Sequence, residues 1–170
     1  MKKTIVVFAS AALLFAACNN SSTSEQTNTE STTPAADTAA APQASATAEV
    51  TLNAGDDMKY DKTEITVKEG QTVKLTLNHT GKSPVTAMGH NFVLLAQGVD
   101  VNKFAQAAIG AKDNDYIPKD MTKDVIAHTK TIGGGESATV EFTAPAKGTY
   151  DYICSFPGHV AVMHGQFIVE

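Results

Sequence analysis

The 170-residue sequence contains no arginine, so every cationic side chain other than histidine belongs to a lysine. Bidentate recognition of phosphates and of base edges relies heavily on arginine. The 18 acidic residues outnumber the 13 lysines and give a formal net charge of −5 at pH 7. Loss of Lys2 and Lys3 with a cleaved leader would make the chain more negative still. The composition therefore argues against nucleic acid as a partner.

Cysteine is also scarce, with Cys18 near the N-terminus and Cys154 near the C-terminus. Exported proteins usually pair their thiols as disulfides. A lone thiol in an oxidising compartment is open to oxidation unless a partner such as a metal ion occupies it. A buried, inert thiol is the alternative, because free cysteine often packs as a small apolar side chain. The cysteine count alone leaves both interpretations open.

The apolar run from Thr4 to Ala17 is too short to span a bilayer comfortably. It follows Lys2-Lys3 and ends in small residues, as a secretory signal peptide does. Phe15-Ala-Ala-Cys18 resembles a lipoprotein processing site, whereas an ordinary signal peptide with an incidental cysteine is the alternative. We expect a lipoprotein-type signal peptide over residues 1–17 and a lipid anchor at Cys18. The protein would then be exported and held at the periplasmic or outer-membrane surface.

Residues 19–48 contain no aromatic and no large aliphatic side chain. Such a segment cannot bury enough apolar surface to offset the entropy lost on ordering. We interpret residues 18–48 as the lipidated cysteine and a flexible low-complexity tether, and residues 49–170 as the folded domain.

Within the folded domain, apolar and polar side chains alternate in short runs, the period of half-buried strands. The alternating sets are Val50/Leu52, Ile65/Val67, Val73/Leu75/Leu77, Val140/Phe142 and Phe167/Val169. About 120 residues of short strands separated by turn signals predict an all-β, two-sheet Greek-key sandwich. Val101 to Ala111 has the spacing of one short inserted helix. The polar stretch 112–124 is expected to be a solvated loop.

The segment from Tyr152 to Met163 carries a thiol at Cys154, an imidazole at His159 and a thioether at Met163. Met88-Gly-His-Asn91 offers a second imidazole at His90. Each side chain alone is more often structural than a ligand. Together, two imidazoles, a thiolate and a weak axial thioether form the ligand set of a blue-copper electron-transfer site.

The loop has four residues between its cysteine and histidine and three between its histidine and methionine. With Ala87-Met-Gly-His-Asn91 and Val125-Ile-Ala-His-Thr-Lys130, this spacing resembles azurin, in the blue-copper cupredoxin family, over residues 50–170. The resemblance implies one type 1 copper held by His90, Cys154, His159 and the axial Met163, with the Gly89 carbonyl nearby. It also implies that the backbone N–H groups of Asn91 and Phe156 donate to the Cys154 sulfur. His79 and His128 match non-ligand histidines of that family.

The resemblance further implies that His159 reaches the surface within an apolar docking patch. The patch residues would be Met58, Met88, Phe156, Pro157 and Val160. Transient redox partners such as c-type cytochromes or terminal oxidases and reductases would dock there.

The leading hypothesis is therefore an electron carrier that shuttles single electrons and is not an enzyme. A copper storage or delivery protein is the main alternative, although such proteins usually expose many soft ligands and this chain has only five methionines. A thiol enzyme using Cys154 lacks an acidic orienting partner for its histidine. Zinc is disfavoured because methionine is a poor zinc ligand.

Overall fold

The computed structural model describes residues 46–170. The expected signal peptide, the lipidation at Cys18 and nearly all of the expected tether lie outside the described residues. Within 46–170, no helix has the length and apolar character needed to cross a membrane.

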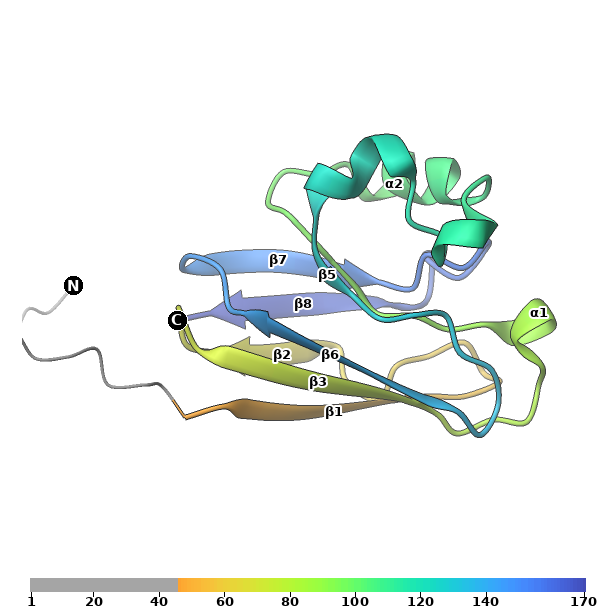
Figure 1. Ribbon diagram of the computed structural model, residues 1–170, viewed down its shortest axis with the longest axis horizontal. Coiled ribbons are helices and arrows are strands. Elements are labelled where there is room, and N and C mark those ends of the chain that lie inside the picture. Colours follow the sequence, from red (N-terminus) through yellow and green to blue (C-terminus); the bar gives the residue numbers. More distant parts are fainter. Residues whose placement is uncertain (1–45) are drawn as a thin grey trace, which may run out of the picture. The chain divides into compact units, whose positions relative to one another are not determined.

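Within the described residues, eight strands form two sheets. Figure 1 shows how the sheets are arranged. The three-stranded sheet has the order β1-β3-β6, and its strands are β1 (Ala48–Ala54), β3 (Thr72–His79) and β6 (Ser137–Thr143). The five-stranded sheet has the order β2-β8-β7-β4-β5. Its strands are β2 (Glu64–Val67), β4 (Val93–Leu95), β5 (Val125–His128), β7 (Gly148–Ile153) and β8 (His164–Val169). The predicted all-β sandwich is confirmed.

Both sheets mix parallel and antiparallel pairs. β1 runs parallel to β3 and β2 runs parallel to β8, whereas β6, β7, β4 and β5 pair antiparallel with their neighbours. Chain segments far apart in sequence therefore share each sheet, so that β2, the second strand, lies beside β8, the last.

The core lies between the two sheets and follows the alternation seen in the sequence. In β3, Val73, Leu75 and Leu77 are fully buried, while Lys74 between them is exposed. Phe167 in β8 and Leu52 in β1 join the same cluster. Burial of a side chain of this size contributes roughly 1.5–3 kcal/mol, so the period-two pattern fixes which face of each strand turns inward.

A second, smaller core lies on the outer side of the five-stranded sheet. Helix α2 (Val101–Ala108) buries Phe104 against Val93, Leu95 and Ile153. Figure 1 shows this helix packed outside the five-stranded sheet. The carboxylate of Asp100 caps this helix, accepting from Lys103 N–H at 3.0 Å. Because both faces of β4 are covered, its three residues are all buried and show no alternation.

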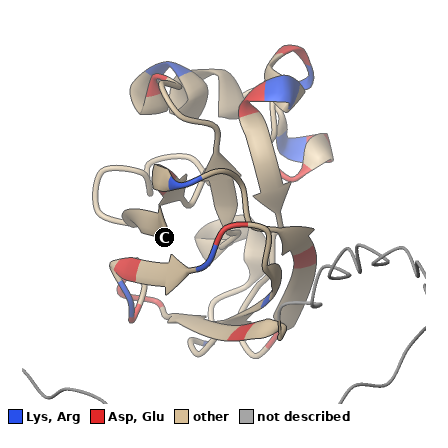
Figure 2. Ribbon diagram, turned by 90° about the vertical axis from the view of Figure 1, so that its left-hand side faces the viewer, with Lys and Arg blue, Asp and Glu red and all other residues tan. Residues whose placement is uncertain are grey.

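The expected inserted helix is present but ends at Ala108, three residues earlier than its predicted end at Ala111. Three further helical turns were not predicted: α1 (Val85–Met88) and the 3-10 turns η1 (Lys112–Asn114) and η2 (Lys119–Asp124). Figure 2 shows lysine and acidic residues gathered on the helical part of the molecule, while the strands carry few. Stretch 112–124 is thus partly helical, and its buried residues include Tyr116 and Ile117.

Candidate metal centre

Three of the predicted ligand side chains converge at one end of the sandwich. The donor atoms of His90, Cys154 and His159 all lie within 4.8 Å of one another, and all three residues are buried. Cys154 Sγ is 4.0 Å from His90 Nδ1 and 3.6 Å from His159 Nδ1. Donors about 2.0–2.3 Å from a shared metal ion, spread about 120° apart, would be separated by about 3.7 Å. The spacing therefore fits a single ion.

His90 is oriented by the backbone around it. Its amide donates to Ile132 O at 3.0 Å and its carbonyl accepts from Ile132 N–H at 2.8 Å. The ring Nε2 lies 2.9 Å from Gly55 O, and since a carbonyl only accepts, Nε2 carries the proton. Nδ1 then keeps its lone pair on the side that faces Cys154 Sγ, the tautomer that a metal ligand needs.

The other donors come from the loop that joins β7 to β8, at the end of the sandwich opposite the C-terminus (Figure 1). Cys154 N–H donates to Met163 O at 3.0 Å, which closes the loop at its base. Inside it, Met163 N–H donates to His159 O at 2.9 Å. Gly158 takes a left-handed φ of 85°, a conformation that glycine adopts without cost. The loop therefore presents its donors from a closely bonded turn.

The thiol of Cys154 is fully buried, and burial raises its pKa to about 12. The backbone N–H groups of Asn91 and Phe156 donate to the sulfur and act in the opposite direction. These are the two donors that the resemblance implied. Without a metal the group is a neutral thiol at neutral pH, and a positive ion is needed to hold it as thiolate.

The pKa values of both ligand imidazoles are also lowered, which favours their neutral forms. Burial, together with nearby His90 and His79, lowers the pKa of His159 to about 4. Burial likewise lowers the pKa of His90. Both rings are therefore neutral at pH 7 and have lone pairs available for a metal.

Residues 46–170 match the family described as copper binding proteins, plastocyanin/azurin family. The chain belongs to this family. Azurin-1 of Alcaligenes xylosoxydans xylosoxydans is 42% identical over 124 residues, which cover 71% of this chain and 95% of that protein. Outer membrane protein H.8 of Neisseria meningitidis serogroup B is 40% identical over 120 residues, or 68% of this chain. The match spans only 64% of the length of that relative.

Solved structures of a "blue" copper protein and of an azurin share the fold. Auracyanin A, a "blue" copper protein from Chloroflexus aurantiacus, has a TM-score of 0.66 and 34% identity, covering 73% of this chain and 99% of its own. An azurin from Methylomonas sp. strain J has a TM-score of 0.65 and 37% identity, covering 72% and 98%. The resemblance to azurin is thus confirmed, and copper is the cofactor that this donor set suits.

The remaining predicted site residues differ in burial. Met163 is fully buried, and Gly89 O is 3.9 Å from Cys154 Sγ. The five residues of the expected docking patch, Met58, Met88, Phe156, Pro157 and Val160, are each partly exposed. His159 is only 3% exposed, and its ring lies 4.7 Å from that of Phe156.

The two histidines expected to be non-ligands have different surroundings. His79 is buried, and its ring stacks on that of His90 with centroids 4.4 Å apart. Its Nδ1 accepts from Gly81 N–H and its Nε2 donates to Met88 O, so neither nitrogen is free to bind a metal. His128 is exposed on β5, with Nδ1 3.1 Å from Thr129 O.

Three residues near the centre were missed by sequence reasoning. Tyr60 donates its buried hydroxyl to Asn91 O at 2.6 Å. Asp115 accepts from the Asn91 side chain, and the Tyr116 ring contacts that of Phe156. Tyr60 forms an isolated β-bridge with Ala54, and the other two residues lie in a polar stretch, so no local pattern marked them.

Proposed function

We propose that this protein is a type 1 copper electron carrier that passes single electrons between redox partners. His90, Cys154 and His159 would be the main copper ligands, with Met163 as the axial ligand and the Gly89 carbonyl beside the ion. Copper, when bound, supplies the one-electron couple. The observation that carries the proposal is the convergence of two neutral imidazoles and one thiol within 4.8 Å in a buried site.

The chain's own part is to hold this donor set in one arrangement. The bonds of His90 to Gly55 and Ile132, and of Cys154 to Met163, fix the ligands before a metal arrives. Electron transfer is fast when the surroundings barely rearrange between oxidation states, so a pre-formed site favours this function. Asn91 and Phe156 donate to the sulfur and make the thiolate a poorer electron donor, which favours the reduced state.

Visible spectroscopy tests the proposal. Copper(II) added to the full-length protein should give an intense blue thiolate-to-copper band, and Cys154→Ser should abolish it. Met163→Leu should alter the band, whereas Met121→Leu, a matched methionine in η2, should leave it unchanged. A copper-loaded protein without the band would disprove the type 1 assignment.

A storage or delivery role gains no support from the site. Its ligands are buried, with exposures of 0% for His90 and Cys154 and 3% for His159. A protein that hands copper on needs an incoming ligand to reach the ion. Slow loss of copper(I) to a mild chelator is expected, and rapid loss would favour delivery instead.

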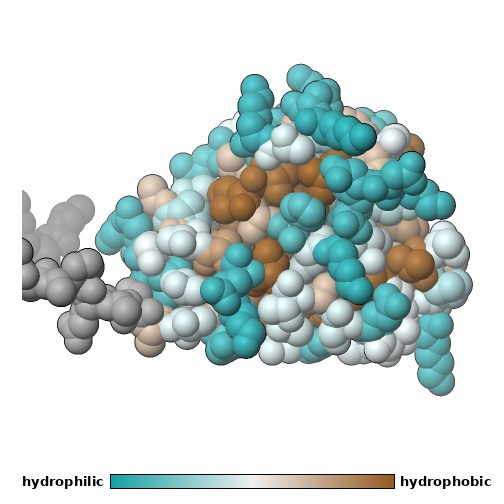
Figure 3. Space-filling view, viewed as in Figure 1, coloured by the Kyte–Doolittle hydropathy of each residue, from teal (hydrophilic) through white to brown (hydrophobic). Residues whose placement is uncertain are grey.

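The docking patch supplies the route for electrons. Its five residues are partly exposed, and the ring of one of them, Phe156, lies 4.7 Å from the His159 ring. Val85 in α1 and Val162 in the ligand loop add apolar surface, with exposures of 40% and 52%. On the face shown in Figure 3, apolar residues form several clusters with polar side chains among them. Partners such as c-type cytochromes or terminal oxidases and reductases would dock on the patch.

Export and anchoring at Cys18 complete the proposal. The similarity to a protein named outer membrane protein H.8 supports an exported location. Cys18→Ser should move the protein from the membrane fraction to the soluble periplasmic fraction with its blue band intact. Unchanged fractionation would count against the lipid anchor without affecting the copper site.

A further inference from the structure

The turn at Asp115 and Tyr116 has an unusual backbone. Both residues take left-handed conformations, with φ of 51° and 60°. Such angles are costly for residues other than glycine, and they persist where the surrounding structure imposes them. Asparagine and aspartate tolerate this region, but a bulky tyrosine seldom enters it. The contacts of these two residues therefore show what the turn serves.

Asp115 ties together two segments that flank His90. Its carbonyl accepts from Asn91 Nδ2 at 2.7 Å, and its carboxylate accepts from Thr131 N–H at 2.7 Å. Residue 131 precedes Ile132, the backbone partner of His90. Asp115 thus fixes Asn91 on one side and the His90–Ile132 bridge on the other.

Tyr116 supports the ligand loop. It is 8% exposed, and its ring meets that of Phe156 edge-on, with centroids 5.1 Å apart and planes at 62°. Phe156 also leaves no room at Gly89, where an added Cβ would lie 2.7 Å from Phe156 Cδ2. The Phe156 ring is therefore held between Tyr116 and the segment that carries His90.

The two contacts converge on the Cys154 sulfur. Asn91 and Phe156 are the residues whose N–H groups donate to it, and one turn restrains both. We propose that Asp115 and Tyr116 are positioning residues that set the strength of these two hydrogen bonds and hence the reduction potential of the copper site. This inference rests on the proposed electron-transfer function.

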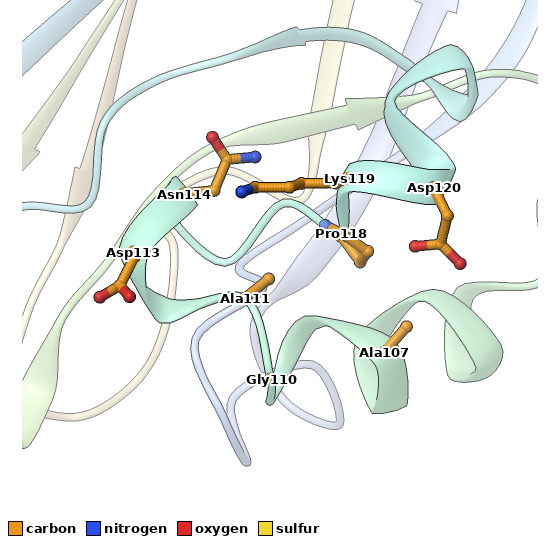
Figure 4. Close-up of a pocket in the computed structure, with 8 residues that line it drawn as sticks. All are labelled: Ala107, Gly110, Ala111, Asp113, Asn114, Pro118, Lys119 and Asp120. Atoms are coloured by element: carbon orange, nitrogen blue, oxygen red, sulfur yellow. The ribbon is translucent and has the colours of Figure 1, made fainter.

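The outer surface of the same stretch does not explain the turn. The cavity beside it is lined by Ala107, Gly110, Ala111, Asp113, Asn114, Pro118, Lys119 and Asp120, which offer small, carboxylate, amide and ammonium groups at the surface (Figure 4). Asp115 and Tyr116 are absent from this lining. Their contacts are with Asn91, Thr131 and Phe156 instead.

The test compares tyrosine variants of the copper-loaded, full-length protein. Tyr116→Leu removes the edge-on contact, so the N–H···S bonds should loosen and the reduction potential should fall. A tenfold change in the relative affinity for copper(II) and copper(I) is expected, equivalent to about 59 mV for one electron. Tyr116→Phe keeps the ring and should restore the wild-type potential. Tyr150→Leu is the matched control, because Tyr150 is similarly buried but bonds to Ala146 near the other end of β7.

Asp115 variants separate charge from positioning. Asp115→Asn keeps an acceptor oxygen and the left-handed turn but removes the negative charge. Asp115→Gly also keeps the turn and loses the anchor to Thr131. The potential of Asp115→Gly should lie below that of Asp115→Asn. Equal potentials in these two variants, or a Tyr116→Leu potential that matches Tyr150→Leu, would overturn the inference.

Hydrogen exchange of the metal-free protein provides a readout that needs no copper. The amides of Asn91 and Phe156 should exchange at least tenfold faster in Tyr116→Leu than in Tyr150→Leu, and Tyr116→Phe should match wild type. Unchanged protection would overturn the inference even if the blue band is present. Absence of a blue band in the wild type would instead disprove the proposed function. The amide exchange of Asn91 and Phe156 would then still test whether the turn positions these two residues.

Discussion

The side chain of Asn91 bonds to Ser155 through both of its polar atoms. Nδ2 donates to Ser155 Oγ at 2.8 Å, and Oδ1 accepts from Ser155 N–H at 2.9 Å. The two residues follow His90 and Cys154 in sequence, so this pair of hydrogen bonds joins the two ligand segments directly. The site is therefore held together by protein contacts that do not depend on a metal.

Asn91→Leu tests this connection. The substitution keeps the approximate volume but leaves the buried Ser155 and the half-buried Asp115 without their bonds. Each orphaned buried group costs about 1–3 kcal/mol, so the free energy of unfolding of the metal-free protein should fall by about 2–5 kcal/mol. Denaturant unfolding followed by fluorescence or circular dichroism measures it.

Asn78→Leu is the matched control. Asn78 also makes two side-chain bonds, to Asn53 and Ser137, but on the more exposed three-stranded sheet. Water replaces those bonds when the side chain is lost, so the change should stay below about 1 kcal/mol. Equal losses in the two variants would contradict a special role for Asn91.

Local sequence patterns predicted much of the fold. β1, β2, β3, β6 and β8 were visible because each buries one face, which leaves an alternating pattern. β4 was not visible because α2 covers its outer face and removes the alternation. The parallel pairing of β1 with β3 and of β2 with β8 depends on long-range packing and has no local signal.

Local sequence likewise predicted some residues of the site and not others. Cys154, His159 and Met163 share one loop, so their spacing is a local feature, and the flanking sequence around His90 carried the resemblance that added it. Asp115 and Tyr116 were hidden, because the stretch 112–124 is polar in composition and their partners are distant in sequence. The polar composition of that stretch reflects its exposed residues and gives no sign of the residues that face the site.

Copper(II) binding should release one proton at neutral pH. Burial raises the pKa of the Cys154 thiol to about 12 and lowers that of His159 to about 4, so only the thiol carries a displaceable proton at pH 7. The apparent affinity should therefore rise about tenfold per pH unit above neutrality, up to about pH 12.

Calorimetry in buffers of different ionisation enthalpy counts this proton directly. Cys154→Ser should release none, because a serine hydroxyl keeps its proton. A value near zero in the wild type would mean that the folded, metal-free protein already holds a thiolate.

The metal-free protein should lose stability on mild acidification. The pKa of His159 is lowered from 6.5 to about 4, so the unfolded state binds a proton first as the pH falls. The stabilising effect is complete above pH 6.5 and is lost as the pH falls through about 4. His90 shifts in the same direction, whereas Asp56 and Asp61, lowered from 3.8, act below this window.

The expected loss from His159 is roughly 1–3 kcal/mol, since a full pKa unit corresponds to 1.36 kcal/mol and solvent screening reduces it. Denaturant unfolding at several pH values between 7.5 and 4 would show it, and His159→Asn should flatten the profile. The same slope in wild type and variant would place the effect elsewhere.

Gly89→Ala tests how tightly the centre is enclosed. An added Cβ would lie 2.7 Å from both Phe156 Cδ2 and Val85 O, closer than such contacts occur. The Phe156 ring cannot retreat easily, because the rings of Tyr116 and His159 also contact it. We expect a loss of about 1–3 kcal/mol from overpacking, together with a shifted blue band and faster copper loss. Gly110→Ala is the control, because its nearest neighbour, Ala107 O, is at an ordinary 3.8 Å. If Gly89→Ala keeps the wild-type spectrum and stability, the Phe156 ring is freer to move than its contacts with Tyr116 and His159 imply.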